Sequence, residues 1–346
     1  MLSPGPSTPS VAVFGAGAWG TALAAAACRN ANVVLWGRQA NAMAQMTSSG
    51  INNTYLPGIQ LPTALRYTSD SAQAFAHLTS GGNRSLLLLG TPMSGLLDMS
   101  ELILRQLEQG LQIAGVVWTC KGLLPDSAAL AHEAVHQVLK SRSDLALGVL
   151  SGPSFAKEVA RGLPVALTIA SASAELRQTV TEVFHSDHMR IYGSSDLIGV
   201  EVGGALKNVM AIACGISDGL GLGDNARAAL ITRGLAEMTR FGVALGAQAT
   251  TFAGLTGLGD LVLTATGDQS RNRQVGLRIG RGESLTDILA GGLTAEGARC
   301  AQAVLHRAKS IGIVMPITEA VCETLFEGVS PSDAVSRLMA RSATHE

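Results

Sequence analysis

Gly15-Ala16-Gly17-Ala18-Trp19-Gly20 places three glycines in the spacing G-x-G-x-x-G, between an apolar run at 11–14 and an alanine-rich stretch at 21–27. The apolar run is typical of a buried strand and the alanine-rich stretch of a helix. The glycines therefore fall on a strand-to-helix turn, where a dinucleotide fingerprint must lie. There the first glycine permits the tight turn, the second lets the backbone approach a pyrophosphate, and the third allows close helix–strand packing.

A glycine turn also arises as plain structure, but the context on both sides favours a nucleotide site. The N-terminus of the predicted helix would offer unpaired N–H groups and a partial positive charge to the phosphates. Gly15, Gly17 and Gly20 are therefore predicted to bind a cofactor.

The second predicted strand, 33–36, ends at Gly37-Arg38 and bears on the choice of cofactor. In NAD-selective folds an acidic side chain near this point binds the ribose hydroxyls, whereas an arginine meets the 2′-phosphate of NADP. This chain has Arg38 and no adjacent carboxylate. Because a guanidinium both stacks and pairs with phosphate, we expect NADP(H) or NAD(H), with NADP(H) favoured. The alternative is that Arg38 is a solvated charge at the end of a strand.

Further strand-like apolar runs alternate with helical segments, which predicts a parallel sheet covered on both faces. The runs lie at 85–89, 115–120, 145–150, 165–170 and 189–192. Ligands of such sheets bind beyond the carboxyl ends of the strands, and Lys121 and the turn 151–154 fall at that edge. Pro153 suits the first turn of a helix at 155–159, whose N-terminus would face an anion. Each feature alone is as readily a surface lysine or a simple cap, but their convergence favours a site.

The character of the chain changes near residue 195, where strand-like runs give way to helical stretches with glycine stops. We predict a flexible tail at 1–10, a dinucleotide-binding α/β domain at 11–195 and an all-helical domain at 196–346. The tail is rich in proline and serine, with no basic start and no apolar core, so it does not read as a signal peptide.

In the second half, the stretch 200–216 reads as a buried helix in which Lys207 and Asn208 are nearly the only polar residues. Loss of hydration lowers the pKa of such a lysine and suits it to proton exchange. Gly203 and Gly204 lie on the same helix face and would let a ligand approach the amine. The alternative is a lysine that reaches the surface, with glycines that serve helix packing.

Two later segments add polar groups. Asp260 follows the glycine-rich run 254–259, and it either caps the next helix or orients the lysine or a substrate hydroxyl. Ser270, Arg271 and Asn272 supply a hydroxyl, a guanidinium and an amide, which together suit one phosphate, although such a run alone is more often an ordinary polar loop.

Arg233 and Glu237, four residues apart on a predicted helix at 225–241, read as a surface or interface pair.

Length and composition bound the remaining possibilities. The 346 residues predict about two domains. A formal net charge of −1 argues against a nucleic-acid partner or an anionic membrane surface. Five cysteines without C-x-x-C spacing indicate free thiols in a reducing compartment. No apolar run approaches the roughly 18 residues that span a bilayer. We therefore expect a soluble cytoplasmic protein without membrane insertion, and the histidine, cysteine and aspartate spacing predicts no metal site.

Five segments resemble the bacterial NAD(P)-dependent sn-glycerol-3-phosphate dehydrogenases, and the resemblance covers roughly residues 10–330. They are GAGAWGTALA from Gly15, SGPSFAKEVA from Ser151, EVGGALKNVMAIACGISDG from Glu201, NARAALITRGLAEM from Asn225 and GLGDLVLTATGDQSRNR from Gly257. The resemblance implies a Rossmann-type doubly wound sheet followed by an all-α domain of the 6-phosphogluconate-dehydrogenase type.

The resemblance also implies a reaction, the reversible NAD(P)H-dependent reduction of dihydroxyacetone phosphate to sn-glycerol 3-phosphate, which supplies glycerophospholipid synthesis. It implies a homodimer as well. It makes Lys207 the general acid/base, helped by Asp260, and places Lys121 against both cofactor and substrate. The implied substrate contacts are Lys121, Gly152, Ser154, Lys207, Asp260, Ser270, Arg271 and Asn272. The implied cofactor contacts are Ala18, Trp19, Arg38, Lys121, Ala156, Arg271 and Glu296.

The chain departs from the family pattern at two of these positions. Ala18 stands where a serine is common, and TAEG around Glu296 replaces the more usual VVEG.

Two other functions stay open. One is a 3-hydroxyacid dehydrogenase of similar two-domain build, whose substrate anion is a carboxylate. The other is a non-catalytic NAD(P)H-sensing protein, which would need no buried lysine.

Overall fold

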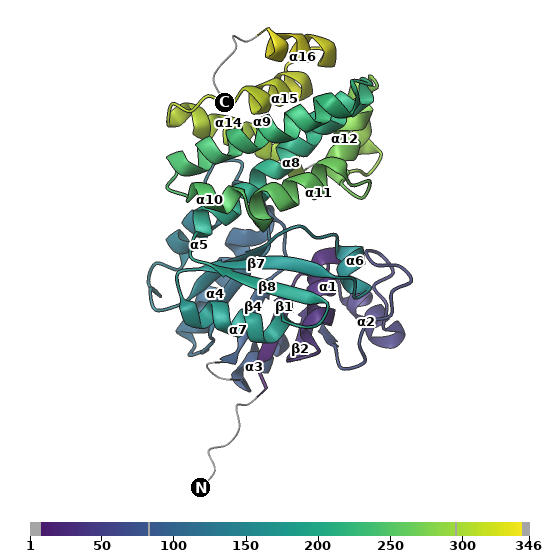
Figure 1. Ribbon diagram of the computed structural model, residues 1–346. Coiled ribbons are helices and arrows are strands. Elements are labelled where there is room, and N and C mark those ends of the chain that lie inside the picture. Colours follow the sequence, from purple (N-terminus) through teal and green to yellow (C-terminus); the bar gives the residue numbers. More distant parts are fainter. Residues whose placement is uncertain (1–7, 82–83, 295, 341–346) are drawn as a thin grey trace. The chain divides into compact units, whose positions relative to one another are not determined.

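The computed structural model describes residues 8–81, 84–294 and 296–340 (Figure 1). The chain divides into two compact units, which are considered separately below. Unit 1 comprises residues 1–121 and 131–197, and unit 2 comprises 122–130 and 198–346. Residues 1–7 of the predicted tail lie outside the described residues, and Ser10 already belongs to the first strand. The segment 122–130 belongs to unit 2, although the sequence placed it in the dinucleotide-binding part.

Unit 1 is built on one eight-stranded sheet with the order β3-β2-β1-β4-β5-β6-β7-β8. The order runs outward in both directions from β1 and β4, so the unit is doubly wound with its topological switch point between these two strands. The predicted α/β fold class is confirmed. The strands are β1 Ser10–Phe14, β2 Asn32–Trp36, β3 Arg66–Thr68, β4 Leu86–Leu89, β5 Gly115–Trp118, β6 Leu147–Ser151, β7 Val165–Ser171 and β8 Met189–Ser194.

The prediction of an all-parallel sheet is wrong for the last two strands. β6 pairs antiparallel with β7, and β8 then runs parallel to β7. A parallel neighbour requires a crossover that carries the chain back along the sheet, usually on a full helix. The connection at 152–164 contains only the five-residue helix α6, Ala156–Ala160, and the chain returns in the opposite direction.

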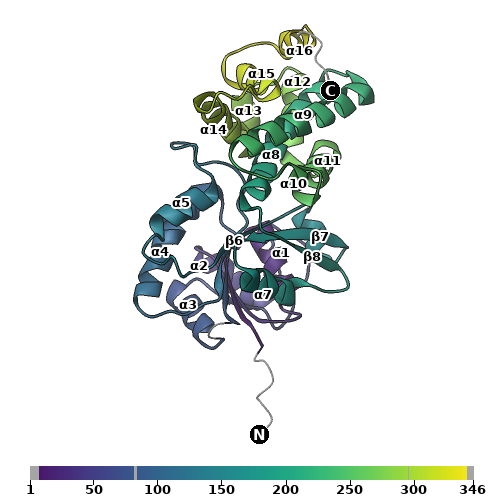
Figure 2. The same ribbon diagram turned by 60° about the vertical axis from the view of Figure 1, so that its left-hand side comes forward.

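Helices cover both faces of the sheet, and the alternation of side chains along each strand decides which face they meet. Val11, Val13 and Leu88 belong to the core beneath α1 and α7, whereas Phe14 packs against Phe75 of α3 with the ring centroids 4.9 Å apart. In Figure 2, α4 and α5 lie on one side of the sheet and α1 and α7 on the other. The helices of unit 1 are α1 Ala18–Ala27, α2 Ala40–Ser49, α3 Ser71–Thr79, η2 Met93–Gly95, α4 Leu96–Glu108, α5 Ala131–Val138, α6 and α7 Ala174–Phe184.

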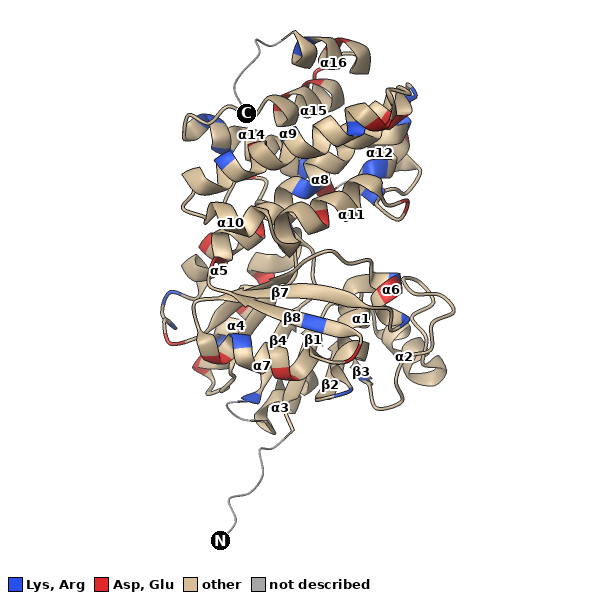
Figure 3. Ribbon diagram, viewed as in Figure 1, with Lys and Arg blue, Asp and Glu red and all other residues tan. Residues whose placement is uncertain are grey.

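Burial on both faces leaves little room for charge in the sheet. In Figure 3 most of the sheet is tan, the colour of residues other than Lys, Arg, Asp and Glu. Among the eight strands only β3 and β8, the two edge strands, carry a charged residue, namely Arg66 and Arg190. Ionisable groups that act on a ligand in unit 1 must therefore come from its loops and helix ends.

The described residues of unit 2 form helices and no strands, as the sequence predicted for this half. The elements are α8 Leu197–Gly219, α9 Gly223–Ala244, α10 Ala249–Phe252, the π-helical turn η3 Leu255–Gly259, α11 Asp260–Thr266, α12 Arg271–Gly280, α13 Leu285–Ala290, α14 Glu296–Ser310, α15 Pro316–Phe326 and α16 Pro331–Met339. Helix α8 is apolar and long enough to cross a membrane, but 89% of its most apolar window is buried inside the protein, as in the core helix of a soluble domain.

All five cysteines are free thiols, and three of them, Cys214, Cys300 and Cys322, are buried. Burial raises the pKa of Cys214 to about 12 and that of Cys28 to about 11. A thiol with such a pKa stays protonated at neutral pH and is a poor nucleophile. Cys28 and Cys214 therefore serve packing.

The prediction that Glu237 forms a surface or interface pair with Arg233 is wrong, because Glu237 is 1% exposed and its carboxylate receives the N-terminus of α15. Its two oxygens accept hydrogen bonds from the backbone N–H groups of Ile317 and Thr318, both at 2.9 Å, and from the Thr318 hydroxyl at 2.7 Å. The first N–H groups of a helix have no partner within the helix, so a buried helix start needs acceptors from elsewhere. Glu237 supplies them across 80 residues of sequence.

Replacing Glu237 with alanine is expected to lower the free energy of unfolding by about 2–4 kcal/mol, since it leaves buried donors without acceptors and opens a cavity. Urea unfolding followed by circular dichroism measures the loss. The matched control is Glu283→Ala, which removes an exposed partner of Arg278. An unfolding midpoint for Glu237→Ala equal to that of the control would contradict the capping role.

Candidate functional site

The glycine-rich turn after β1 is shaped by contacts that exclude a side chain. Gly15 has φ 120°, and a Cβ there would lie 2.7 Å from the carbonyl carbon and oxygen of Gly90. A Cβ on Gly20 would overlap the Gly15 carbonyl oxygen. Gly15 follows β1 and Gly90 follows β4, so the two backbones meet at the switch point, where ligands of doubly wound sheets bind.

The start of α1 faces open space beside this turn. Gly17 is the N-cap of α1, and a Cβ built on it would have no neighbour within 4 Å. Ala18 and Trp19 are the first two residues of the helix. A helix start without a capping side chain, reached through a glycine, leaves backbone N–H groups accessible to an anion. This is the arrangement predicted from the G-x-G-x-x-G spacing.

Arg38 lies on the turn between β2 and α2. The preceding residue, Gly37, packs against the glycine-rich turn and so keeps Arg38 close to it. A Cβ on Gly37 would lie 2.9 Å from the Ala16 Cβ, so the two turns touch. Arg38 is exposed, and its guanidinium makes no hydrogen bond or ion pair with any residue that the structure describes. It is therefore available to a ligand bound at the start of α1.

The remaining predicted residues of unit 1 follow the carboxyl ends of β5 and β6. Lys121 lies three residues after β5, and Gly152 (φ 142°) directly follows β6. The Ser154 hydroxyl donates to the Gly152 carbonyl oxygen at 3.2 Å, which tightens this turn. Ala156 is the first residue of α6.

The predicted anion site at the start of α6 is not supported. Phe155 is the N-cap of this helix, so Pro153 lies outside the first turn, and a helix of five residues adds little dipole. Two hydroxyls at this edge of the sheet lack a hydrogen-bond partner among the described residues: that of Ser151, which the sequence placed at this edge as part of the turn 151–154, and that of Thr91, which was missed from the sequence. Thr91 Oγ1 and Ser151 Oγ are both buried. Ser151 is the last residue of β6, and the sequence signal for Thr91 was its position two residues after β4.

In unit 2, Lys207 of α8 meets α11. Its Nζ donates to Asp260 Oδ1 at 2.7 Å and to Thr264 Oγ1 at 2.8 Å, and the Thr264 hydroxyl donates to the Asp260 carbonyl oxygen at 2.6 Å. Lys207 is 8% exposed and Asp260 is fully buried. An ammonium in such a place needs charge-assisted hydrogen bonds to offset its lost hydration. Thr264 was missed from the sequence, although the spacing of four residues from Asp260 puts both on one helix face.

The pairing of Lys207 with Asp260 follows from a close backbone contact one turn earlier on α8. A Cβ on Gly203 would overlap the carbonyl oxygen of Thr256, within the π-helical turn η3 that directly precedes Asp260. Gly203 thus serves the packing of η3 on α8, and the expectation that it opens a path for a ligand is wrong. The glycine brings α11 close enough for Asp260 to reach the lysine.

The predicted phosphate-binding run lies at the start of α12. Ser270 is the N-cap and is 4% exposed, and its Oγ accepts from the Arg273 backbone N–H at 3.2 Å. The Ser270 hydroxyl proton has no acceptor among the described residues. Arg271 is exposed and donates from Nη1 to Thr294 Oγ1 at 2.7 Å. Both side chains keep donor capacity for an anion at this helix start.

Asn272 connects three helices. Its Nδ2 donates to Asn208 Oδ1 of α8 at 3.0 Å, and its Oδ1 accepts from the Gly297 backbone N–H of α14, also at 3.0 Å. Asn208 follows Lys207, and Glu296, which is exposed, precedes Gly297. The structure thus joins Lys207 to Asp260, and it links Asn272 to the residues that neighbour Lys207 and Glu296 in the sequence, Asn208 and Gly297.

Across residues 8–81, 84–294 and 296–340, no group of three or more histidine, cysteine, aspartate or glutamate side chains is placed to hold a metal ion. The polar groups described above are an ammonium, guanidinium groups, hydroxyls, amides and one buried carboxylate that is paired with the ammonium. Such a donor set suits a phosphorylated organic ligand and proton transfer.

Comparison with known proteins agrees with this geometry. Residues 10–177 match the family model described as NAD-dependent glycerol-3-phosphate dehydrogenase N-terminus, and residues 196–336 match its C-terminus. Glycerol-3-phosphate dehydrogenase [NAD(P)+] of Ralstonia nicotianae is 55% identical, over 97% of this chain and 98% of that protein. The enzyme of the same name from Burkholderia orbicola is also 55% identical, over 97% and 99%. The crystal structure of glycerol-3-phosphate dehydrogenase from Coxiella burnetii superposes with a TM-score of 0.87 at 38% identity, covering 96% of this chain and 99% of that one.

Proposed function

Because the chain belongs to the NAD-dependent glycerol-3-phosphate dehydrogenase family, we propose that it catalyses the reversible reduction of dihydroxyacetone phosphate to sn-glycerol 3-phosphate with NAD(P)H. The observation that carries the proposal is the buried Lys207 ammonium, held by Asp260 and Thr264. A non-catalytic sensor would need no such costly buried charge. Two relatives at 55% identity that are named for this activity also favour this reaction over that of a 3-hydroxyacid dehydrogenase.

The turn around Gly15 fits a dinucleotide cofactor. A Cβ on Gly15 or Gly20 would collide with backbone, while the space at Gly17 is open, as a close backbone approach to a pyrophosphate requires. Gly15, Gly17, Ala18, Trp19 and Gly20 would hold the pyrophosphate, and Arg38 the adenosine end. When bound, the nicotinamide supplies the hydride that reduces the ketone carbon. Lys121, Ala156, Arg271 and Glu296 are proposed as further cofactor contacts.

Lys207 is proposed to act as general acid in the reducing direction. Reduction of the ketone places negative charge on its oxygen, and the ammonium donates a proton to that oxygen as the charge develops. A cation fixed in a water-poor site stabilises this charge far more than a solvated one. Asp260 and Thr264 hold Nζ in place, and Lys121 adds positive potential as a second contact with the substrate.

Ser270, Arg271 and Asn272 are proposed to bind the phosphate, with Gly152 and Ser154 as additional substrate contacts. Arg271 offers a guanidinium and Ser270 an uncommitted hydroxyl proton at the N-terminus of α12. The phosphate is remote from the reacting carbon, so its binding energy serves orientation of the ketone. Loss of this contact should therefore lower turnover as well as affinity.

The experiment that tests the function is NADPH oxidation by the purified protein on addition of dihydroxyacetone phosphate, with unphosphorylated dihydroxyacetone as the control. Rapid oxidation with the phosphate ester and far slower oxidation with dihydroxyacetone is the expected result. No oxidation by a protein that still binds NADPH would refute the proposed reaction.

We propose NADP(H) as the preferred cofactor, because Arg38 is exposed and uncommitted beside the glycine-rich turn and has no neighbouring carboxylate. Replacing Arg38 with aspartate should raise KM for NADPH at least about tenfold relative to KM for NADH, since a carboxylate repels the 2′-phosphate. Arg190→Asp, on the far edge strand of the same sheet, is the control for a change in net charge. An unchanged ratio of the two KM values would show that Arg38 takes no part in cofactor choice.

We also propose a cytoplasmic homodimer that supplies the phospholipid backbone. Free thiols at all five cysteines are typical of a reducing compartment. Sedimentation equilibrium tests the dimer, and cell fractionation tests the compartment.

A further inference from the structure

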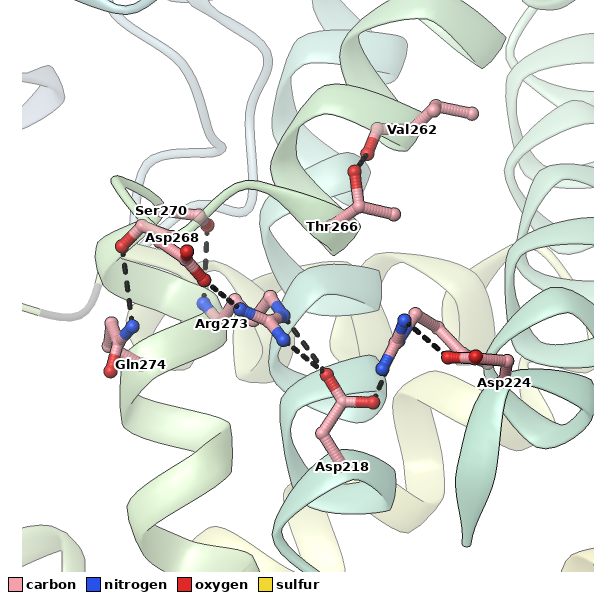
Figure 4. Close-up of polar contacts among 9 residues, drawn as sticks. Asp218, Asp224, Val262, Thr266, Asp268, Ser270, Arg273 and Gln274 are labelled. Carbon is pink, nitrogen blue, oxygen red and sulfur yellow. Dashed lines mark hydrogen bonds and ion pairs between the residues drawn. The ribbon is translucent and has the colours of Figure 1, made fainter. Parts of the chain in front are cut away.

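The Asp218 carboxylate lies in the last turn of α8, where the helix dipole disfavours negative charge, and its side chain is only 5% exposed. Two guanidinium groups offset this cost. Arg227 of α9 donates from Nε to Oδ1 at 2.8 Å. Arg273 of α12 donates from Nε and Nη2 to Oδ2, at 3.0 and 2.8 Å. Figure 4 shows the Asp218 carboxylate and its contacts with Arg273. Asp218 therefore joins three helices of unit 2.

Helices α8 and α12 pack backbone to backbone. A Cβ on Gly215 of α8 would overlap the Arg273 carbonyl oxygen, and one on Gly276 of α12 would overlap that of Ile212. Further along, a Cβ on Gly219 would lie 2.9 Å from the Gly280 Cα. Helices usually fix their register by side-chain ridges that fit into grooves. A glycine contact permits close approach but offers no such ridges, so polar contacts help to set the register of α12 on α8, together with the core packing of Val275 and Ile279.

The structure shows two such contacts, and both involve the first turn of α12. Asn272 bonds to Asn208, and Arg273 reaches along α8 to Asp218. Lys207 and Asp218 are eleven positions apart, which is close to three helical turns and places both on one face of α8. A shift of α12 along this face would therefore move Ser270 and Arg271 relative to Lys207.

We infer that Asp218 is a positioning residue for the substrate phosphate. By holding Arg273 it sets the first turn of α12 at a defined distance from the Lys207 ammonium. Asp218 also binds the Arg273 guanidinium, and Nη1 of the same group donates to Asp268 at 3.0 Å. With Arg273 committed to these carboxylates, Arg271 is the exposed arginine at the start of α12. The inference rests on the proposed function, because it takes the phosphate of dihydroxyacetone phosphate as the ligand of this helix start.

The test compares a phosphorylated and an unphosphorylated substrate in the full-length Asp218→Asn variant. For dihydroxyacetone phosphate, kcat/KM should fall about 10- to 100-fold, because the anchored phosphate no longer places the ketone at Lys207. For dihydroxyacetone, which has no phosphate to misplace, kcat/KM should change by less than about twofold. A merely structural role of Asp218 would lower both values by the same factor.

The control is Asp224→Asn. The Asp224 side chain is 90% exposed, and its carboxylate is the other one that Arg227 binds. Both substrates should react with this variant as with the wild type. Arg273→Lys serves as the second variant and decides the matter should Asp218→Asn fail to fold, since it keeps the positive charge but lacks the two donors that reach Oδ2. It should show the same selective loss with a smaller factor.

Equal losses for the two substrates, or an unchanged ratio in both variants, would overturn the positioning role. A wild-type protein that does not reduce dihydroxyacetone phosphate would overturn the proposed function, and the inference with it. A wild type that is active on the phosphate ester, together with an unselective Asp218→Asn, overturns the inference alone.

Discussion

Replacement of Lys207 by alanine is expected to lower kcat for dihydroxyacetone phosphate reduction by about 10²- to 10⁴-fold, the usual contribution of a positioned general acid. The physical reason is the loss of the proton donor and of the fixed positive charge at the reacting oxygen. NADPH should still bind, because the glycine-rich turn and Arg38 belong to unit 1 and do not depend on this side chain. Steady-state rates of NADPH oxidation measure the first effect, and fluorescence titration with NADPH measures the second.

The matched control for this change is Lys309→Ala, which removes an exposed lysine near the end of α14 in the same unit. It should keep wild-type kcat. Full activity of Lys207→Ala would refute the acid/base assignment. Loss of NADPH binding together with activity would instead indicate a general structural defect.

Asp260→Asn is expected to lower the free energy of unfolding by about 3 kcal/mol and to impair turnover, because it leaves a buried ammonium without its counter-charge. Lys207 is 8% exposed, so water replaces the lost partner only poorly. Guanidinium chloride unfolding measures the stability, and NADPH oxidation measures turnover. The exposed pair of Arg142 and Asp144 provides the control, and Asp144→Asn should leave the unfolding midpoint unchanged.

The double variant Lys207→Met with Asp260→Asn separates the two effects of Asp260. With both charges removed, the desolvation penalty disappears, and stability should return close to the wild-type value while activity stays lost. A double variant as unstable as Asp260→Asn would show that the carboxylate stabilises the fold through contacts other than the lysine.

Several features followed from local patterns in the sequence. The G-x-G-x-x-G turn was predictable because glycine is needed where a side chain would collide with backbone. The strands were predictable because strands covered on both faces of a sheet are apolar throughout. The change near residue 195 was visible because strand-like runs give way there to helical periodicity. The buried helix around Lys207 was predictable for the same reason, since a single charge in a long apolar segment stands out by composition alone. The cofactor fingerprint and the position of Arg38 needed no knowledge of distant contacts.

Other features were predicted wrongly or missed because they depend on residues far apart in the chain. The direction of β7 depends on how the short connection 152–164 crosses the sheet end, which apolar runs do not encode. Glu237 caps a helix that begins 79 residues later, at Pro316, whereas its sequence neighbourhood suggested a surface or interface pair with Arg233. Gly203 was taken for a ligand path, yet the space above it is filled by the Thr256 carbonyl.

The sequence by itself therefore determined the fold class, the cofactor turn and the identity of the buried lysine, because each is set by residues within a few positions of one another. Only the tertiary structure decided what that lysine meets. Asp260 and Thr264 reach Lys207 because Gly203 admits the η3 turn, and Asp218 holds α12 because glycines bring two helix backbones together. Such contacts arise from close packing between distant segments, and no local rule of the chain specifies their partners.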